Sequence, residues 1–262
     1  MPADTVELLF LGTGTSAGVP MIGCHCDVCS STDPRDKRTR SSVVIRYGGT
    51  TVLVDTTPEL RLQAVANGID RVDGIVFTHA HADHIMGLDD VRRYNAIKGG
   101  PLDVWADDRT FATLSTCFGY AFQPPDPEAK VFRPHLQHRP IRGPFEVAGT
   151  AWTPVPLLHG RAPVLGFRVG RLAYCTDVST IPESSFDLLH GLDVLVLDAL
   201  QWKPHLTHFN IPQAIEIAAR IGAKQTYFTH IAHGVSHATD DAKLPAGVHL
   251  AYDGLSIVAA AD

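Results

Sequence analysis

The stretch "HAHADH", residues 79–84, places four metal-binding types of side chain within six positions. It closely follows the apolar run "GIVF", and a buried strand that ends in polar side chains directs them to a sheet edge, where clefts form. Imidazole and carboxylate groups are common ligands of zinc, manganese and iron. Burial without a cation would leave their polar atoms unpaired, so the stretch predicts a metal site. The four side chains are His79, His81, Asp83 and His84.

Other apolar runs end in the same types of side chain. "WTPVPLLH" ends at His159, "RLAYCTD" ends at Asp177, and "QTYFTH" ends at His230. A single histidine of this kind is more often a surface residue or a hydrogen-bonded core residue. Because several strand ends can converge at one sheet edge, the whole set predicts one shared site.

A second cluster, "GCHCDVCSS", holds three thiols within six residues: Cys24, Cys26 and Cys29. A disulfide would leave one thiol over, and a tetrahedral metal would need a fourth ligand from elsewhere in the chain. The alternative to a metal site is a cluster of free thiols in a mobile loop. Cys117 and Cys175 lie in apolar surroundings and are expected to be buried core thiols, which fits a reducing compartment.

Strands and helices must position these side chains, and the residue patterns predict both. Strands are expected in "VELLFLG", in "SSVVIRYGGTTVLVDT" with Gly48-Gly49 as a hairpin turn, and in the apolar runs above. Helices are expected at 57–68, 89–97 and 210–222. The last two runs, "VHLAYDG" and "LSIVAAA", are expected to pair as a hairpin.

Helices and mixed strands spread through both halves predict a layered α/β architecture with the sheets inside. The chain has 262 residues, of which 45% are hydrophobic and 19% charged. No linker, repeat or change in composition divides it, so one domain over residues 1–262 is expected.

The net charge of −6 argues against broad binding to nucleic-acid backbones, and the run "RDKRTR" is expected to be a solvated loop. The N-terminal stretch is not typical of a signal peptide, and no segment approaches the ~20 apolar residues of a membrane span. These features predict a cytoplasmic protein without membrane partners. They leave the oligomeric state open, and a homodimer is allowed.

The stretch "THAHADHIMGL" resembles the H-x-H-x-D-H signature of the metallo-β-lactamase superfamily. The later residues His159, Asp177 and His230 follow in that superfamily's order, so the resemblance spans nearly the whole chain. It implies an αββα sandwich of two mixed β-sheets with helices on the outer faces. It also implies two divalent cations, manganese or zinc, at the edge of the sandwich.

The resemblance also implies which residues bind each cation. His79, His81 and His159 would bind the first cation, and Asp83, His84 and His230 would bind the second. Asp177 would bridge the two cations, and Asp55 would hold a ligand in orientation without binding metal itself.

Three stretches are similar to a bacterial phosphodiesterase branch that includes phosphoribosyl 1,2-cyclic phosphate phosphodiesterase: "LFLGTGTSAGVPMIGCHCDVC", "HADHIMGLDDVRRYN" and "PHLTHFNI". In that branch a cysteine cluster and a later histidine bind a structural zinc. The resemblance therefore implies that His233 in "THIAHG" completes a Cys₃His site with Cys24, Cys26 and Cys29.

The same branch implies that His208 is the general acid, and a surface residue before the helix is the alternative. His205 could position a phosphate, although a plain loop histidine is equally consistent with the sequence. His135 and His138 are expected in a Pro-rich, solvent-exposed loop.

These features predict a metal-dependent phosphodiesterase. It would hydrolyse a cyclic phosphate or a small nucleotide-like phosphodiester with a hydroxide that the two cations generate from water. The first alternative is a tRNA 3′-processing endonuclease, which normally carries a long basic arm that this sequence lacks. Thioesterase and lactamase activities explain the cysteines and His208 less well. A non-catalytic nucleotide-binding metalloprotein is the alternative from a different class.

Overall fold

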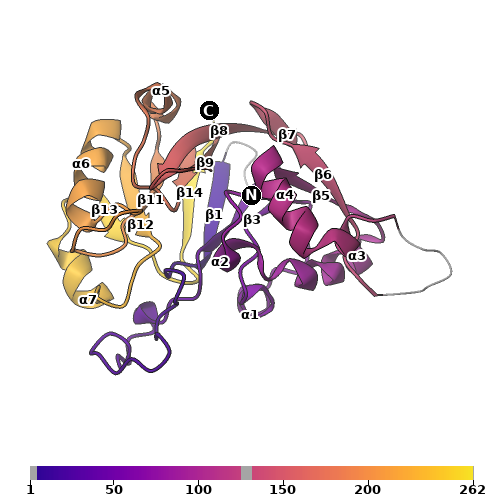
Figure 1. Cartoon of the computed structure of the whole chain (residues 1–262). Coiled ribbons are helices and arrows are strands. Elements are labelled where there is room, and N and C mark those ends of the chain that lie inside the picture. The colour runs from indigo at the N-terminus through magenta and orange to yellow at the C-terminus, as the bar shows by residue number, and fades with distance from the viewer. Residues whose placement is uncertain (1–4, 125–131, 262) are drawn as a thin grey trace.

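The computed structural model describes residues 5–124 and 132–261, which form two seven-stranded sheets packed face to face (Figure 1). The first sheet has the order β14-β1-β2-β3-β4-β5-β6. Its strands are β1 (Thr5–Gly12), β2 (Ser42–Tyr47), β3 (Thr50–Val54), β4 (Gly74–Val76), β5 (Leu102–Ala106), β6 (Leu136–Pro140) and β14 (Ser256–Ala260).

The second sheet has the order β13-β12-β11-β10-β9-β8-β7. Its strands are β7 (Phe145–Val147), β8 (Thr150–His159), β9 (Ala162–Val169), β10 (Leu172–Cys175), β11 (Val194–Asp198), β12 (Gln225–Thr229) and β13 (Val248–Leu250). Strands β10 to β13 are parallel to one another, and β7 to β10 are antiparallel. The first sheet is also mixed, because β14, β1, β2 and β3 pair antiparallel and β3 to β6 pair parallel.

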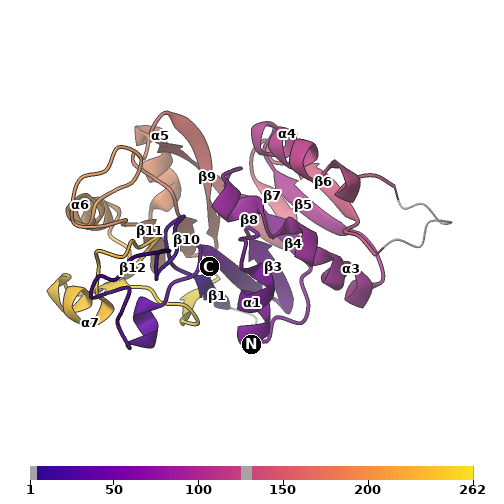
Figure 2. The same ribbon diagram turned by 60° about the horizontal axis from the view of Figure 1, so that its bottom comes forward.

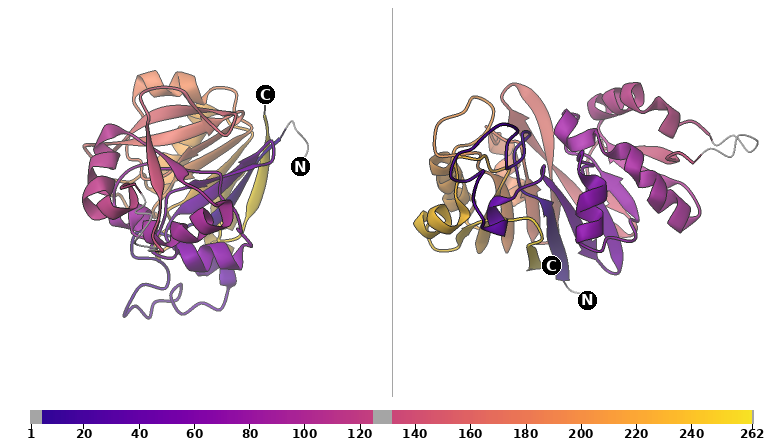
Figure 3. Two further views of the ribbon diagram at one scale, coloured as in Figure 1. Left: turned by 90° about the vertical axis from the view of Figure 1, so that its right-hand side faces the viewer. Right: turned by 90° about the horizontal axis from the view of Figure 1, so that it is seen from below.

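Helices lie on both outer faces of the sandwich (Figures 2 and 3). The first sheet carries α1 (Leu60–Ala66), α3 (Arg92–Lys98) and α4 (Asp108–Cys117), and the second carries α5 (Glu183–Phe186) and α6 (Ile211–Ile221). Two single-turn helices are α2 (Ala82–Ile85) and α7 (His237–Asp240). This arrangement confirms the αββα sandwich, and no helix in the described ranges is long and apolar enough to cross a membrane.

Three apolar clusters account for the layers. The central cluster joins the inner faces of the two sheets and includes Phe10, Trp152 and Tyr174. The other two fill the spaces between each sheet and its helices. Strand ends are therefore held rigidly from both sides, which positions the side chains that follow them.

Local signals predicted several of these elements correctly. Gly48 and Gly49 form the β2–β3 hairpin turn with φ values of 55° and 84°, a conformation that favours glycine. Helix α1 ends before Gly68, which has φ 62°. Asn210 caps α6 by accepting a hydrogen bond from the backbone N–H of Gln213, and Gln213 returns a bond to the cap.

The predicted C-terminal hairpin is wrong. Strand β13 pairs with β12 in the second sheet, whereas β14 pairs with β1 in the first sheet. The chain crosses between the sheets through the turn at Asp253-Gly254, so β14 covers the edge of β1 instead of that of β13. The alternation of apolar residues in both strands predicted their type but not their partners.

Three side chains also lie in environments that differ from the predicted ones. Cys117 is exposed although it follows Thr110 and Leu114 on the same face of α4, because it is the last residue of the helix. His138 belongs to β6, and its half-buried ring stacks on Phe111 at 3.6 Å between centroids. His135 is half-buried, and its backbone N–H donates to Asn95. Cys175 is buried, as predicted.

Candidate metal centre and active site

The predicted site residues gather where strands of the two sheets end. Asp55 follows β3, His159 ends β8, Asp177 follows β10, and His230 follows β12. Asp55, Asp177 and His230 have left-handed backbone conformations with φ values of 64°, 53° and 60°. Non-glycine residues seldom adopt this strained conformation, and such strain concentrates at functional sites.

Asp177 lies at the centre of the cluster and is almost fully buried. Its carboxylate oxygens lie 3.3 Å from Nε2 of His84, 3.4 Å from Nε2 of His230 and 3.8 Å from Nε2 of His79. The carboxylate of Asp83 lies 3.4 Å and 3.7 Å from the same atoms of His84 and His230. Ligand atoms on one tetrahedral cation lie ~3.4 Å apart when each bond is ~2.1 Å, so these distances match a shared cation.

The ligand-type atoms fall into neighbouring groups that share Asp177. Asp83, His84, Asp177 and His230 make one group, and His79, His81 and Asp177 make another. His159 groups with Asp177 and His208, and its ring lies 5.1 Å from that of His81 between centroids. The predicted first-cation ligands and the predicted second-cation ligands thus fall into different groups, and both sets share Asp177.

The hydrogen bonds leave ring nitrogens free to bind a cation. Nδ1 of His84 contacts Asp55 at 2.8 Å, and Nδ1 of His159 lies 2.6 Å from the Thr207 carbonyl oxygen. Because a carbonyl oxygen only accepts, His159 carries its proton on Nδ1 and presents a lone pair on Nε2. The Nε2 atoms of His79, His84 and His230 are buried and have no hydrogen-bond partner among the described residues. Buried unpaired nitrogens are costly, so the donor set fits divalent cations.

Asp55 is fully buried and makes contacts that fit its predicted supporting role. Its carboxylate accepts hydrogen bonds from the backbone N–H and the hydroxyl of Thr78, at 2.9 Å and 2.7 Å, as well as contacting His84. These contacts fix the carboxylate beneath the His84 ring, and thereby fix the direction of the free Nε2 atom.

Electrostatic effects within the cluster are strong. Burial alone would lower the pKa of His84, but the carboxylates of Asp177 and Asp55 outweigh it and raise that pKa well above the usual value. Burial would raise the pKa of Asp177, but His230 and His84 outweigh it and hold the pKa well below the usual value. Burial lowers the pKa of His79 well below its ordinary range. The cluster therefore favours an ionised Asp177, and without a cation the protonated ring of His84 balances its charge.

His208 is buried beside these residues. Its ring stacks on that of His230 at 4.6 Å between centroids, and the ring of His159 lies 4.5 Å away. Nδ1 of His208 lies 2.6 Å from a carboxylate oxygen of Asp198, which also accepts the backbone N–H of Val178 at 2.8 Å. Burial lowers the pKa of His208 and raises that of Asp198 well above its ordinary value.

Asp198 was not among the site residues predicted from the sequence. It ends β11, in "DVLVLDAL", and so carries the same signal as Asp177 and His159: an acidic or imidazole group after an apolar strand. His205 is exposed, and its ring lies 5.2 Å from that of His208. Its Nδ1 is 3.3 Å from the hydroxyl of Thr207, so it borders the site without entering it.

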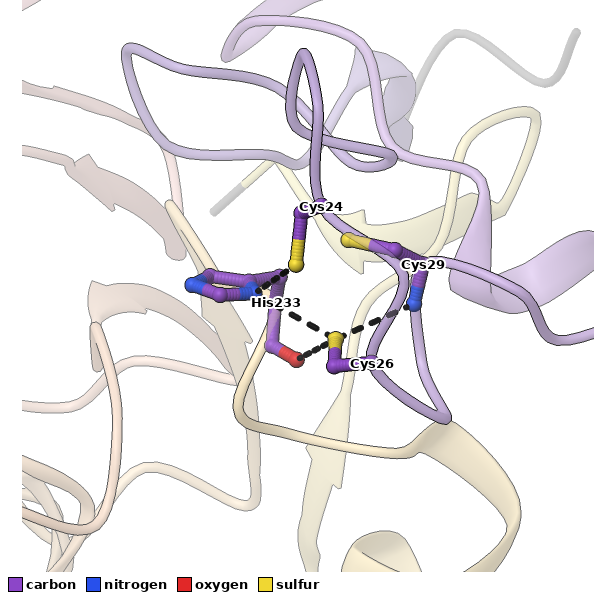
Figure 4. A group of neighbouring side chains, drawn as sticks. All are labelled: Cys24, Cys26, Cys29 and His233. Atoms are coloured by element: carbon purple, nitrogen blue, oxygen red, sulfur yellow. Dashed lines mark hydrogen bonds between the residues drawn. The ribbon is translucent and has the colours of Figure 1, made fainter.

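The three cysteines and His233 also converge, as Figure 4 shows. Nδ1 of His233 lies 3.3 Å from Sγ of Cys24 and 3.4 Å from Sγ of Cys26. A tetrahedral zinc with bonds of ~2.3 Å to sulfur and ~2.05 Å to nitrogen holds such atoms ~3.6 Å apart. All four ligand atoms lie within 4.8 Å of one another, so the group fits a Cys₃His zinc site.

The surroundings of the thiols favour a bound cation. Sγ of Cys26 accepts the backbone N–H of Cys29, and Sγ of Cys29 accepts that of Met21, both at 3.4 Å. The bond from Cys29 and the contact with His233 lower the pKa of Cys26 to about 6. Burial raises the pKa of Cys29. A thiolate at Cys26 near neutral pH is the form that binds zinc.

Comparisons with known proteins identify the family of the chain. A family model described as beta-lactamase superfamily domain matches residues 50–231. A crystal structure of a diphosphatase from the PhnP family is 44% identical, with a TM-score of 0.90 and 97% of both chains covered. The zinc-bound PqqB of Methylobacterium extorquens has the same fold at 20% identity, with a TM-score of 0.80, covering 96% of this chain and 99% of PqqB.

A curated relative, an octanoyltransferase of Porphyromonas gingivalis, is 35% identical. The match covers 97% of this chain and 51% of the relative, so the chain spans about half of that protein's length. The family model and the well-covered diphosphatase structure agree with the architecture. The chain therefore belongs to the beta-lactamase superfamily, has the metallo-β-lactamase fold, and is a member of the PhnP family.

Proposed function

We propose that this protein is a metal-dependent phosphodiesterase that hydrolyses a small phosphodiester, such as a cyclic phosphate or a nucleotide-like compound. The observation that carries the proposal is the convergence of six ligand-type residues on Asp177, among which His79, His84 and His230 have buried Nε2 atoms without a hydrogen-bond partner in the described residues. The PhnP-family diphosphatase that is 44% identical to this chain also acts on a phosphate compound, which supports this reaction class.

In this proposal His79, His81 and His159 would hold one divalent cation, Asp83, His84 and His230 would hold the second, and Asp177 would serve both. Bound there, two cations would lower the pKa of a water and stabilise negative charge at phosphorus. Asp55 keeps His84 oriented, and the Thr207 carbonyl oxygen keeps His159 in its Nδ1–H tautomer.

His208 acts as the general acid. Its Nδ1 side faces Asp198, so Nε2 is the atom available to hold a proton for the leaving oxygen. Asp198 positions the ring through its contact with Nδ1, and the carboxylates of Asp177 and Asp83 favour the protonated form against the burial that lowers the pKa of His208. His205 at the border contacts the substrate phosphate.

The Cys₃His group is proposed to bind a structural zinc that ties the N-terminal loop to the segment after β12. His230 precedes His233 by one short turn, so this zinc would also hold the backbone that presents His230 to the catalytic site. The octanoyltransferase that resembles this chain is about twice as long, so its transferase activity is not carried over to this proposal.

The test is hydrolysis of bis-p-nitrophenyl phosphate by protein loaded with Mn²⁺ or Zn²⁺, with lactam and thioester substrates in parallel. Asp177→Ala should abolish phosphodiester hydrolysis because both cations lose a shared ligand. Asp187→Ala, at an exposed aspartate on the surface, is the matched control and should keep parental turnover. Near wild-type turnover of Asp177→Ala with both metals still bound would overturn the two-cation assignment.

A further inference from the structure

A threonine directly precedes three of the candidate metal ligands, His79, Asp177 and His230. These threonines are Thr78, Thr176 and Thr229, and each is at most 1% exposed. A buried hydroxyl must find its hydrogen-bond partner within the protein, and next to a ligand that partner can be the ligand itself. The hydrogen bonds of the three hydroxyls therefore show which of them act on the site.

Thr176 contacts the ligand that the two groups share. Its hydroxyl lies 2.8 Å from Oδ1 of Asp177, and an ionised carboxylate only accepts, so the hydroxyl is the donor. The same Oδ1 atom lies 3.3 Å from Nε2 of His84. The other oxygen, Oδ2, lies 3.4 Å from Nε2 of His230 and 3.8 Å from Nε2 of His79. The hydroxyl thus fixes the plane in which the two oxygens face different histidines.

The backbone around Asp177 is fixed without this hydroxyl. Strand β10, which ends two residues earlier, pairs with β9 and β11. On the other side, the backbone N–H of Val178 donates to Asp198 at 2.8 Å, and its carbonyl oxygen accepts the N–H of Phe209 at 2.8 Å. The freedom that remains is rotation of the Asp177 side chain, which the Thr176 hydroxyl restricts.

We propose that Thr176 is a positioning residue for the two-cation site, whose hydroxyl orients the carboxylate of Asp177 so that it can serve both cations. The inference rests on the proposed function, because it takes Asp177 as the shared ligand. The histidine nitrogens near this carboxylate belong to candidate ligands and would turn to the cations, whereas the hydroxyl would keep its bond. Hydrogen-bond partners of metal ligands typically contribute about 10–100-fold to metal affinity.

Thr229 offers a matched comparison within the same molecule. It is fully buried, and it precedes His230, whose left-handed backbone with φ 60° resembles that of Asp177 with φ 53°. Its hydroxyl has no hydrogen-bond partner within residues 5–124 and 132–261. Removal of this hydroxyl therefore changes the polarity beside a ligand without removing a contact.

The experiment is equilibrium dialysis of the full-length, Mn²⁺-loaded protein against Mn²⁺ concentrations buffered with nitrilotriacetate, followed by metal analysis of the manganese bound per chain. Thr176→Val keeps the shape of the side chain but removes the hydroxyl, and should raise the apparent dissociation constant for Mn²⁺ by about 10–100-fold. Thr176→Ser keeps the hydroxyl and should bind Mn²⁺ as the parent does. Thr229→Val, the matched control, should also bind as the parent does.

Melting temperatures of the variants separate metal binding from folding. If Thr176→Val does not fold, Thr176→Ala and Thr176→Ser form a pair that differs by the hydroxyl alone, and the alanine variant should bind Mn²⁺ more weakly. Parental affinity without the hydroxyl, or an equal loss in Thr176→Ser or Thr229→Val, overturns the proposal. A parent that binds Mn²⁺ but does not hydrolyse bis-p-nitrophenyl phosphate contradicts the proposed function only, whereas a parent that binds none contradicts both.

Discussion

At the scale of single residues, His208 and Asp198 form a pair that distinguishes this site from a plain metal cluster. Their 2.6 Å contact is shielded from solvent, and the ring is held against His159 and His230. An imidazole held in this way loses little entropy when it transfers a proton, because its orientation is already set. The pair therefore suits proton donation better than substrate contact alone.

The first prediction concerns the leaving group. A poor leaving group such as a ribose alkoxide needs a proton in the transition state, and a positioned acid contributes ~10²–10⁴-fold, whereas p-nitrophenolate leaves readily without one. His208→Ala should therefore lose far more activity on a ribose-type phosphodiester than on bis-p-nitrophenyl phosphate.

Both substrates are assayed on variant protein that metal analysis shows to hold both cations. The control is His190→Ala, which changes an exposed histidine shortly after α5, and it should leave both rates unchanged. Equal losses on the two substrates would assign His208 to substrate positioning. Unchanged rates on both substrates would show that His208 takes no part in the reaction.

At the scale of elements, the cysteine loop depends on contacts with a distant segment. Residues 13–41 contain little regular structure, and the loop projects from the sandwich beside the segment that follows β12 (Figure 1). The expectation of a solvated loop at "RDKRTR" is wrong for Asp36 and Arg38, because both are buried. They pair at 3.0 Å, and the guanidinium of Arg38 also donates to the Val235 carbonyl oxygen. The Cys₃His group and this ion pair thus connect the same two segments.

The second prediction follows from that connection. Cys26→Ser should lower both the zinc content and the melting temperature, because binding at a structural metal site is coupled to folding. Cys117→Ser is the control, since that thiol is exposed at the end of α4 and belongs to no cluster in the described chain. The zinc site is disproved if Cys26→Ser and Cys117→Ser retain the parental zinc content and melting temperature.

At the scale of the whole molecule, Asp253 joins segments from both ends of the chain. Its carboxylate accepts four hydrogen bonds, from the backbone N–H and the hydroxyl of Thr13 and of Thr39, at 2.7–2.9 Å. These residues lie after β1, in the loop before β2, and in the crossing between β13 and β14. Backbone atoms of Thr13 also pair with Ile231, next to His230.

The third prediction tests this junction. Asp253→Asn replaces one acceptor oxygen with an NH₂ group that faces donors, so it should destabilise the fold by about 1–3 kcal/mol. Urea unfolding measures the change. Asp103→Asn, which alters a surface ion pair with Arg139, should stay within about 0.5 kcal/mol of the parent. Equal effects of the two substitutions would contradict a special role for Asp253.

The sequence alone determined the features that depend on local order. Apolar runs followed by histidine or aspartate predicted the strand ends, and the structure places His79, His159 and Asp177 close together. The spacing of Cys24, Cys26 and Cys29 likewise indicated a cluster in need of a fourth partner. Such patterns can be read directly because periodicity, turn residues and ligand spacing act over a few residues.

Only the tertiary structure decided which distant segments meet. It placed β14 beside β1 instead of β13, paired Asp198 with His208, and left Cys117 exposed. An alternating strand can pair with any suitable edge, and a helix residue is buried only if its face meets a neighbour. These outcomes depend on the free energy of packing the whole chain, which no local pattern contains.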